Sequence, residues 1–139
     1  YSGAGTISSN DPDGRPISLP KVTPESLAGG VKPYSLTDHI HEREAGHHLS
    51  RLLNGSSIKV AFVPSVAPWF SGIISTLSMP VTEKLSARDV IGLYERKYEG
   101  QQLVKIKREV PVMVDIADKH TWTVGGVQDH SEGDRVVVV

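Results

Sequence analysis

The sequence predicts an α+β domain: a mixed, largely antiparallel sheet with two helices on one face. Residues 39–53 and 86–100 show the spacing of apolar side chains that is typical of amphipathic helices. Several shorter runs rich in valine and isoleucine are typical of strands. Along the chain the order is a helix, two strands, a second helix and several more strands, and this order favours the α+β class.

The first 32 residues are rich in glycine, proline and serine, so we expect them to cross the surface with little regular structure. Residues 11–14 (Asp-Pro-Asp-Gly) form a predicted turn, and Gly29 and Gly30 a flexible point. A short helical turn is expected at residues 24–27.

The residues at both ends of the predicted helix over residues 39–53 indicate where it begins and stops. Asp38 can accept a hydrogen bond from the first free amides of the helix. Asn54 and Gly55 suit a left-handed cap, so the helix is expected to stop there. The predicted apolar stripe consists of Ile40, Ala45, Leu49, Leu52 and Leu53.

Two strands and a second helix follow in the predicted order. Residues 58–63 and residues 72–81 are the strands, separated by a loop with two prolines. Ser86 and Asp89 form a helix start that resembles a capping box, with Asp in place of the usual Glu. This helix is expected to end at Gly100.

The remaining strands are expected at residues 103–106, 111–116, 121–124 and 135–139. The last two are predicted to pair through a turn at residues 131–134. Residues 136–139 and residues 58–63 are apolar on both sides, and strands of this kind need cover on both faces. We therefore expect the sheet face away from the helices to meet another domain or another subunit.

Composition narrows the possible functions. The 139 residues suit one domain over residues 1–139, long enough to bury a core. The net charge is −1 without a basic block, which disfavours nucleic acid and anionic membranes as partners, and the apolar runs are too short to span a bilayer. There is no cysteine, which excludes disulfides and thiolate chemistry within these residues. We interpret both chain ends as cuts inside a larger polypeptide.

The chemistry candidates centre on His39 and His41, at the predicted corner between an extended segment and a helix. An imidazole there is solvent-accessible and has an ordinary pKa near neutral, which suits proton transfer. Two histidines at a helix entry can equally be ordinary surface residues. A third interpretation is a metal site formed by His41, Glu44 and His48 on one helix face, although the His-Glu-x-x-His spacing is absent.

A short glycine turn at residues 2–5 (Ser-Gly-Ala-Gly) allows either of two interpretations. Its backbone amides can approach a phosphate or carboxylate closely. It can also be a plain turn.

Several motifs occur together in a fixed order. These are the Ser-Gly-Ala-Gly turn at residues 2–5, a His-x-His followed three residues later by Glu at residues 39–44, a Pro-x-x-x-Pro segment leading to a Gly-Ile strand at residues 64–73, and a valine strand after Gly-Asp-Arg at residues 133–139. With this set, the chain resembles N-acetyl-gamma-glutamyl-phosphate reductase of arginine biosynthesis, in its fungal mitochondrial form. The resemblance implies a fold like the C-terminal catalytic domain of glyceraldehyde-phosphate dehydrogenase.

The resemblance also implies a reaction and a role for each matching residue. The reaction is the NADPH-dependent conversion of N-acetylglutamyl 5-phosphate to N-acetylglutamate 5-semialdehyde and phosphate. His41 is implied as the acid/base residue. His39, Tyr34 and Ser2 are implied to shape the substrate pocket, and Gly3 to lie near the cofactor or phosphate.

Further expectations follow from the same resemblance. NADP is bound mainly by a dinucleotide-binding domain outside these residues, which also lack the nucleophilic cysteine, so the 139-residue chain alone is expected to be inactive. Implied partners are the small-molecule substrate, a second copy contacting through the sheet face, and acetylglutamate kinase. The implied location is the mitochondrial matrix. Two other functions stay open: an oligomerisation module without chemistry of its own, and a small His/Glu metal-binding domain.

Overall fold

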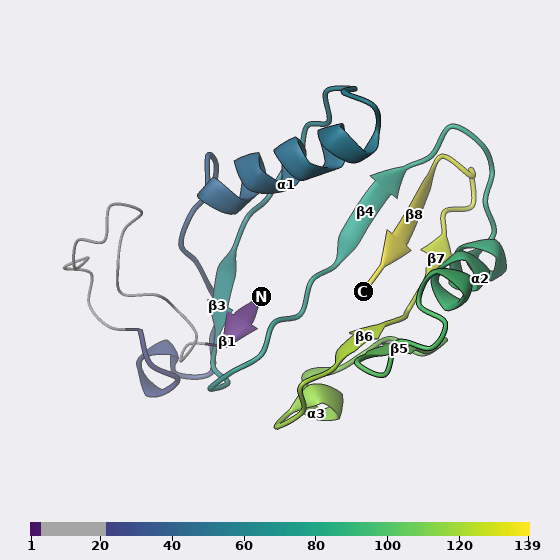
Figure 1. The fold of residues 1–139 in the computed structure, drawn as a ribbon. Helices are drawn as coiled ribbons and strands as arrows, with labels where there is room; N and C mark the ends of the chain where they lie inside the picture. Colours follow the sequence, from purple (N-terminus) through teal and green to yellow (C-terminus); the bar gives the residue numbers. More distant parts are fainter. Residues whose placement is uncertain (4–21) are drawn as a thin grey trace. The chain divides into compact units, whose positions relative to one another are not determined.

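The computed structural model describes residues 1–3 and 22–139 (Figure 1). These residues form two compact units, Tyr1–Ser71 and Gly72–Val139. The mixture of helices and strands confirms the predicted α+β class, but within the described residues the strands form three small sheets instead of one. The extent of a single domain over residues 1–139 stays a prediction. The turn predicted at residues 11–14 lies outside the described residues.

The first unit contains a small mixed sheet with the strand order β1-β3-β2. β1 (Ser2–Gly3) runs parallel to β3 (Ser65–Ala67), and β2 (Lys32–Pro33) runs antiparallel to β3 on its other edge. β3 is buried along its length, as the central strand of such a sheet should be. The helical turn expected near residue 25 is confirmed as the 3₁₀ helix η2 (Glu25–Leu27).

Helix α1 (Ile40–Leu52) matches the predicted helix closely. Asn54 and Gly55 both have left-handed backbone angles, with φ of 54° and 86°, which confirms the predicted stop. The predicted apolar stripe does not pack as expected. Its leucines stay exposed, Leu52 to 78%, and the buried residue of α1 is Gly46.

The strand predicted at residues 58–63 is wrong. This segment is extended but has no strand partner in the described part of the chain, and strand pairing begins only at β3. Its backbone bonds to α1 instead. Ser50 Oγ accepts from the Ile58 N–H at 2.9 Å, and Glu42 Oε2 accepts from the Phe62 N–H at 3.0 Å. Side chains of the helix therefore satisfy donors that a sheet would otherwise satisfy.

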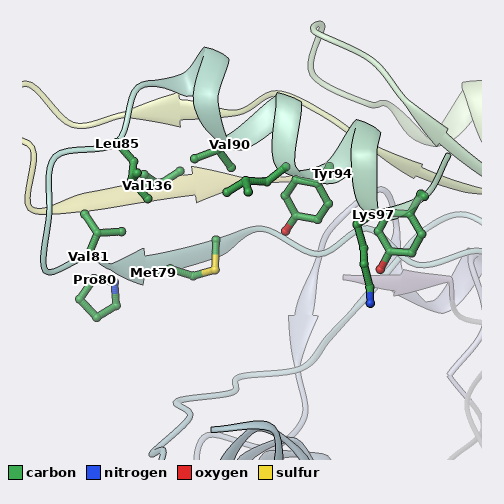
Figure 2. A pocket seen from close by; sticks show the side chains of 10 residues that line it. Met79, Pro80, Val81, Leu85, Val90, Tyr94, Lys97 and Val136 are labelled. Atoms are coloured by element: carbon green, nitrogen blue, oxygen red, sulfur yellow. The ribbon is translucent and has the colours of Figure 1, made fainter.

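The second unit has its core between a sheet and helix α2 (Ala87–Lys97). β4 (Leu77–Pro80), β8 (Arg135–Val138) and β7 (Gln128–Asp129) form an antiparallel sheet. Val90 of α2 belongs to one buried cluster with Val136 and Val138 of β8. Figure 2 shows Val90 above Val136. Burying a valine stabilises a fold by about 1.5–3 kcal/mol.

Helix α2 begins with the predicted capping box. Ser86 Oγ accepts from the Asp89 N–H, and the Asp89 carboxylate accepts from the Ser86 N–H, each at 3.2 Å. Asp129 Oδ1 on β7 accepts from the Ala87 N–H at 3.0 Å, which ties the helix start to the sheet. The sequence therefore predicted this helix start correctly.

The sheet face opposite α2 is more polar than predicted. Because side chains alternate along a strand, Ser78, Gln128 and Val137 share that face. Ser78 and Gln128 are exposed, and Val137 is half-buried. One face of β8 is thus apolar and covered by α2, while its other face has only one valine beside polar neighbours.

The remaining strands of the second unit also differ from the prediction. β5 (Val104–Ile106) pairs in parallel with β6 (Trp122–Val124), while β8 pairs with β4 and β7. The predicted pair of residues 121–124 with residues 135–139 is therefore wrong. A two-residue strand, β7, takes the place beside β8 because the turn after it, with Gly133 at φ 74°, is short.

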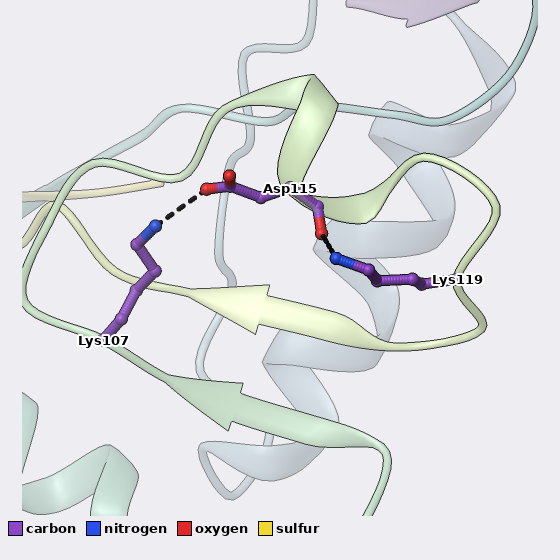
Figure 3. Close-up of polar contacts among 3 residues, drawn as sticks. All are labelled: Lys107, Asp115 and Lys119. Carbon is purple, nitrogen blue, oxygen red and sulfur yellow. Dashed lines mark hydrogen bonds and ion pairs between the residues drawn. The ribbon is translucent and has the colours of Figure 1, made fainter.

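The strand predicted at residues 111–116 is a helical turn, α3 (Met113–Ile116). Lys107 Nζ contacts Asp115 Oδ2 at 2.8 Å, and Lys119 Nζ donates to the Asp115 carbonyl at 2.6 Å (Figure 3). These contacts hold the turn against the β5 side and override the strand propensity of its valines.

In the described segments no helix is long and apolar enough to cross a membrane.

Candidate functional site

The start of α1 is formed differently from the prediction. Its N-cap is His39, whose Nδ1 accepts from the His41 N–H at 3.3 Å. Asp38, the predicted cap, instead adopts a left-handed conformation with φ 58°. Its carboxylate accepts from the Thr37 hydroxyl at 3.5 Å, and its carbonyl accepts from Arg43 Nη2 at 3.4 Å. The cap thus lies one residue later, on an imidazole.

Four rings gather at this helix start, and we call them the histidine corner: Tyr34, His39, His41 and Phe62. The His39 ring is central, with centroids 4.9 Å from His41, 5.5 Å from Phe62 and 5.7 Å from Tyr34. Phe62 also lies 6.4 Å from His41. These distances lie in the range of favourable aromatic contacts. The structure therefore brings together three of the predicted site residues, Tyr34, His39 and His41, and places Phe62 beside the two histidines.

His39 is held in its neutral form. Partial burial lowers its pKa, and the neighbouring His41 lowers it further, against the opposite effect of Glu44 and Glu42. Because Nδ1 accepts the hydrogen bond of the cap, the ring proton lies on Nε2. His39 therefore presents one N–H donor away from the helix.

His41 is the more accessible imidazole. Its side chain is 64% exposed, and its Nε2 lies 3.9 Å from Glu44 Oε2, one helical turn away. An exposed imidazole with a carboxylate behind it is suited to giving and taking a proton at a substrate.

Tyr34 lies just after β2, and its N–H donates to the Pro64 carbonyl at 3.2 Å. This bond fixes the tyrosine beside the start of β3. Partial burial raises the pKa of its phenol, so the hydroxyl keeps its proton at neutral pH. Tyr34 is 47% exposed and can donate a hydrogen bond to a ligand.

Ser2 and Gly3 belong to β1, on the edge of β3 opposite β2. The Ser2 side chain lies outside the described part of the structure. Gly3 is buried, and a Cβ at this position would lie 2.6 Å from the Ser71 backbone nitrogen and 2.8 Å from the Phe70 carbonyl carbon. The close approach of the chain's own backbone therefore explains the glycine. The role of Gly3 near the cofactor or phosphate stays a prediction.

Sequence reasoning did not identify Phe62 and Glu42 as part of the site. Phe62 was assigned to a strand, and Glu42 was one of several charged residues in the first helical turn. The sequence feature that could have indicated Phe62 is that it is the aromatic residue of the apolar run at residues 58–63. The metal interpretation gains no support, since the described residues contain no cluster of three or more His, Asp or Glu side chains that could hold an ion.

A second feature of the molecule is an apolar cavity of about 410 Å³ between α2 and the β4–β8 strands (Figure 2). Its lining includes the buried Val90 and Val136 and also Leu93, which is 51% exposed. Tyr94 and Lys97 extend from α2 over it. Within this unit the cavity has an apolar lining without a cluster of catalytic groups.

Comparison with known proteins gives consistent matches over the whole chain. The family model described as the semialdehyde dehydrogenase dimerisation domain matches residues 1–139. A Schizosaccharomyces pombe protein named as mitochondrial is 40% identical over 139 residues, all of this chain and 14% of that protein. The Neurospora crassa "Protein arg-6, mitochondrial" is 40% identical over 138 residues, 99% of this chain and 14% of that protein.

A bacterial relative is shorter. The N-acetyl-gamma-glutamyl-phosphate reductase of Xanthomonas axonopodis pv. citri is 36% identical over 139 residues, all of this chain and 39% of that enzyme. The chain thus spans between 14% and 39% of the length of these curated relatives. The matches confirm the resemblance found in the motifs, and the names of the fungal relatives confirm the predicted mitochondrial location.

Proposed function

The chain belongs to the semialdehyde dehydrogenase dimerisation-domain family, and from this premise we propose that it is the catalytic and dimerisation domain of an NADP-dependent N-acetyl-gamma-glutamyl-phosphate reductase. The bacterial relatives that bear this enzyme name support the proposal. In the proposed reaction, N-acetylglutamyl 5-phosphate is reduced by NADPH to N-acetylglutamate 5-semialdehyde with release of phosphate.

The proposal divides the chemistry between this chain and the rest of the protein. NADPH supplies the hydride, and a thiol outside these residues supplies the nucleophile, since the chain contains no cysteine. What remains for this chain is to bind the acyl group and to move a proton at the oxygen of the reacting carbon. NADP binding is proposed to lie mainly in a dinucleotide-binding domain outside these residues, with Gly3 near the cofactor or phosphate, from the resemblance alone.

His41 is the proposed acid/base residue, and its exposure together with Glu44 is the observation that carries the proposal. An imidazole in this setting can protonate the alkoxide that forms when hydride reaches the carbon, and can take the proton back when the aldehyde is released. General acid–base catalysis of this kind typically contributes about 10²–10⁴-fold to a rate.

His39 and Tyr34 are the proposed substrate-binding residues beside it. His39 offers its Nε2–H and Tyr34 its hydroxyl, both neutral donors suited to the carbonyl or carboxylate oxygens of an acylated amino acid. Ser2 is proposed as a further substrate contact, from the resemblance alone. Its place in β1 puts it in the same small sheet as the residues before Tyr34.

The assay uses the complete polypeptide, in the reverse direction: phosphate-dependent reduction of NADP with N-acetylglutamate semialdehyde. We expect turnover that requires both phosphate and the semialdehyde. The matched control is the 139-residue chain alone, which we expect to show none. A complete protein that is folded but does not turn over these substrates, or an isolated chain that does, would contradict the proposal.

We also propose that the domain forms a homo-oligomer, as the description of its family supports. Because the sheet face opposite α2 is polar, the apolar cavity beside α2 is the better candidate for the contact. Replacement of Leu93 by aspartate at this cavity is expected to lower the mass measured by light scattering to that of a monomer; an unchanged mass would place the contact elsewhere. Interaction with acetylglutamate kinase stays a prediction.

A further inference from the structure

One face of α1 binds the extended segment that leads to β3 (Figure 1). Glu42, Gly46 and Ser50 lie four residues apart and so share a helix face. Glu42 accepts from the Phe62 N–H, and Ser50 accepts from the Ile58 N–H. Between them, a Cβ on Gly46 would lie 3.0 Å from the Ile58 carbonyl oxygen, so glycine allows the close approach.

The two hydrogen bonds fix the segment along the helix. Eight residues from Glu42 to Ser50 span about 12 Å at the helical rise of about 1.5 Å. Four residues from Ile58 to Phe62 span about 13 Å in an extended chain at about 3.3 Å each. The lengths match, so both ends of the segment are fixed at once, with Phe62 at the start of the helix.

Phe62 therefore lies against the histidines because Glu42 holds its backbone. Its ring centroid is 5.5 Å from His39 and 6.4 Å from His41. The His41 side chain is 64% exposed, and its ring also lies beside His39, with the two centroids 4.9 Å apart. A shift of Phe62 would remove one of the ring contacts that restrict the rotamers of both imidazoles.

We propose that Glu42 and Phe62 are positioning residues: the Glu42 carboxylate, through its hydrogen bond to the Phe62 N–H, holds the phenyl ring that orients His39 and His41 toward the substrate. The inference rests on the proposed function for its effect on rate. The orientation of the histidines is a property of the structure alone and can be measured without turnover.

The test compares Glu42→Ala and Glu42→Gln in the complete polypeptide. Glutamine keeps an oxygen that accepts the same N–H but has no charge, so it separates the hydrogen bond from the effect of the carboxylate on His39. Glu95→Ala is the matched control, because Glu95 is an exposed glutamate on α2. The first readout is the kcat and KM of the reductase. The second is the rate at which diethyl pyrocarbonate modifies His41 relative to His47, measured by peptide mass spectrometry.

For Glu42→Ala we expect kcat to fall about tenfold or more with KM changed by less than about threefold, since misplacement of a catalytic group mainly affects the reacting geometry. The relative modification of His41 should change by about threefold or more. Glu42→Gln should restore both values to within about twofold, and Glu95→Ala should leave both unchanged.

Two results would overturn the inference. The first is unchanged modification of His41 in Glu42→Ala. The second is an equal fall in kcat in Glu42→Ala and Glu42→Gln, because it would assign the effect to the charge of Glu42 and not to its hydrogen bond. If Glu42→Ala does not fold, Phe62→Leu keeps the backbone bond and removes the ring. It should change His41 modification in the same way, and an unchanged value would refute the inference. If only the proposed function is wrong, the wild-type protein will not turn over these substrates, but Glu42→Ala will still change the modification of His41.

Discussion

An imidazole that caps a helix makes the stability of α1 depend on pH, and His39 is the residue to perturb. Its Nδ1 can accept the His41 N–H only while it carries no proton. Its pKa is lowered in the fold from the usual value of 6.5 by burial and by His41. The unfolded chain therefore binds a proton more readily than the folded one. The contribution of the cap is complete above pH 6.5 and is lost as the pH falls through the lowered pKa.

The expected magnitude follows from the geometry of the cap. Loss of an N-cap costs about 0.5–2 kcal/mol, and an exposed bond of 3.3 Å belongs at the lower end, about 0.5–1 kcal/mol. His39→Ala should lose this amount at pH 7.5. His39→Asn should lose little, because asparagine is among the best N-caps and does not titrate.

The assay is urea denaturation of wild type, His39→Ala and His39→Asn at pH 7.5 and pH 5, together with hydrogen exchange of the first turn of α1. The free energy of unfolding of the wild type should fall toward that of the alanine variant at pH 5. The asparagine variant should be less affected by the same change. Parallel pH dependence of wild type and His39→Asn, or full stability of His39→Ala at pH 7.5, would refute the reasoning.

Three further predictions concern parts of the chain outside the histidine corner. Gly3→Ala should destabilise the protein by about 1–3 kcal/mol in urea denaturation, because its Cβ would clash with the Ser71 backbone at 2.6 Å. Val136→Ala removes two methyl groups from a side chain that is 1% exposed, so the free energy of unfolding should fall by about 2–3 kcal/mol. Asp115→Asn should lower the thermal midpoint at pH 7. Since the hydrogen bond from Lys107 lowers the pKa of Asp115, this difference should vanish as the pH falls below the usual 3.8 through the lowered value.

For each of these three variants, one result would contradict the prediction. Full stability of Gly3→Ala would mean that the backbone at Ser71 is free to move away. For Val136 the control is Val114→Ala, at a side chain that is 76% exposed, and equal losses at the two sites would argue against the proposed core. For Asp115, a difference from wild type that persists once the pH lies well below the lowered pKa of Asp115 would exclude the ion pair as its cause.

The sequence predicted best those features that a few neighbouring residues determine. The capping box of Ser86 and Asp89 and the left-handed stop at Asn54 and Gly55 each depend on local hydrogen bonds and backbone angles, and both are present. The start of α1 was displaced by one residue, because a histidine can supply the same acceptor as Asp38. Local rules identify such boundaries but do not choose between adjacent acceptors.

Features that depend on distant partners were predicted poorly. Residues 58–63 have the composition of a strand, but Glu42 and Ser50 satisfy their backbone donors. The segment is therefore bound to a helix, which no pattern within it could indicate. The candidate site shows the same division: His39 and His41 follow from their spacing, whereas Phe62 joins them only through a contact across 20 residues.

The central claim is that the two histidines have different roles, with His41 moving the proton and His39 held neutral in the helix cap. The most direct measurement compares His41→Asn and His39→Asn in the complete polypeptide, using kcat/KM for the phosphate-dependent reduction of NADP by N-acetylglutamate semialdehyde. We predict a loss of about a hundredfold or more for His41→Asn with folding intact, and a clearly smaller loss for His39→Asn, since asparagine preserves the cap. An unchanged rate in His41→Asn, or a larger loss in His39→Asn, would contradict the account.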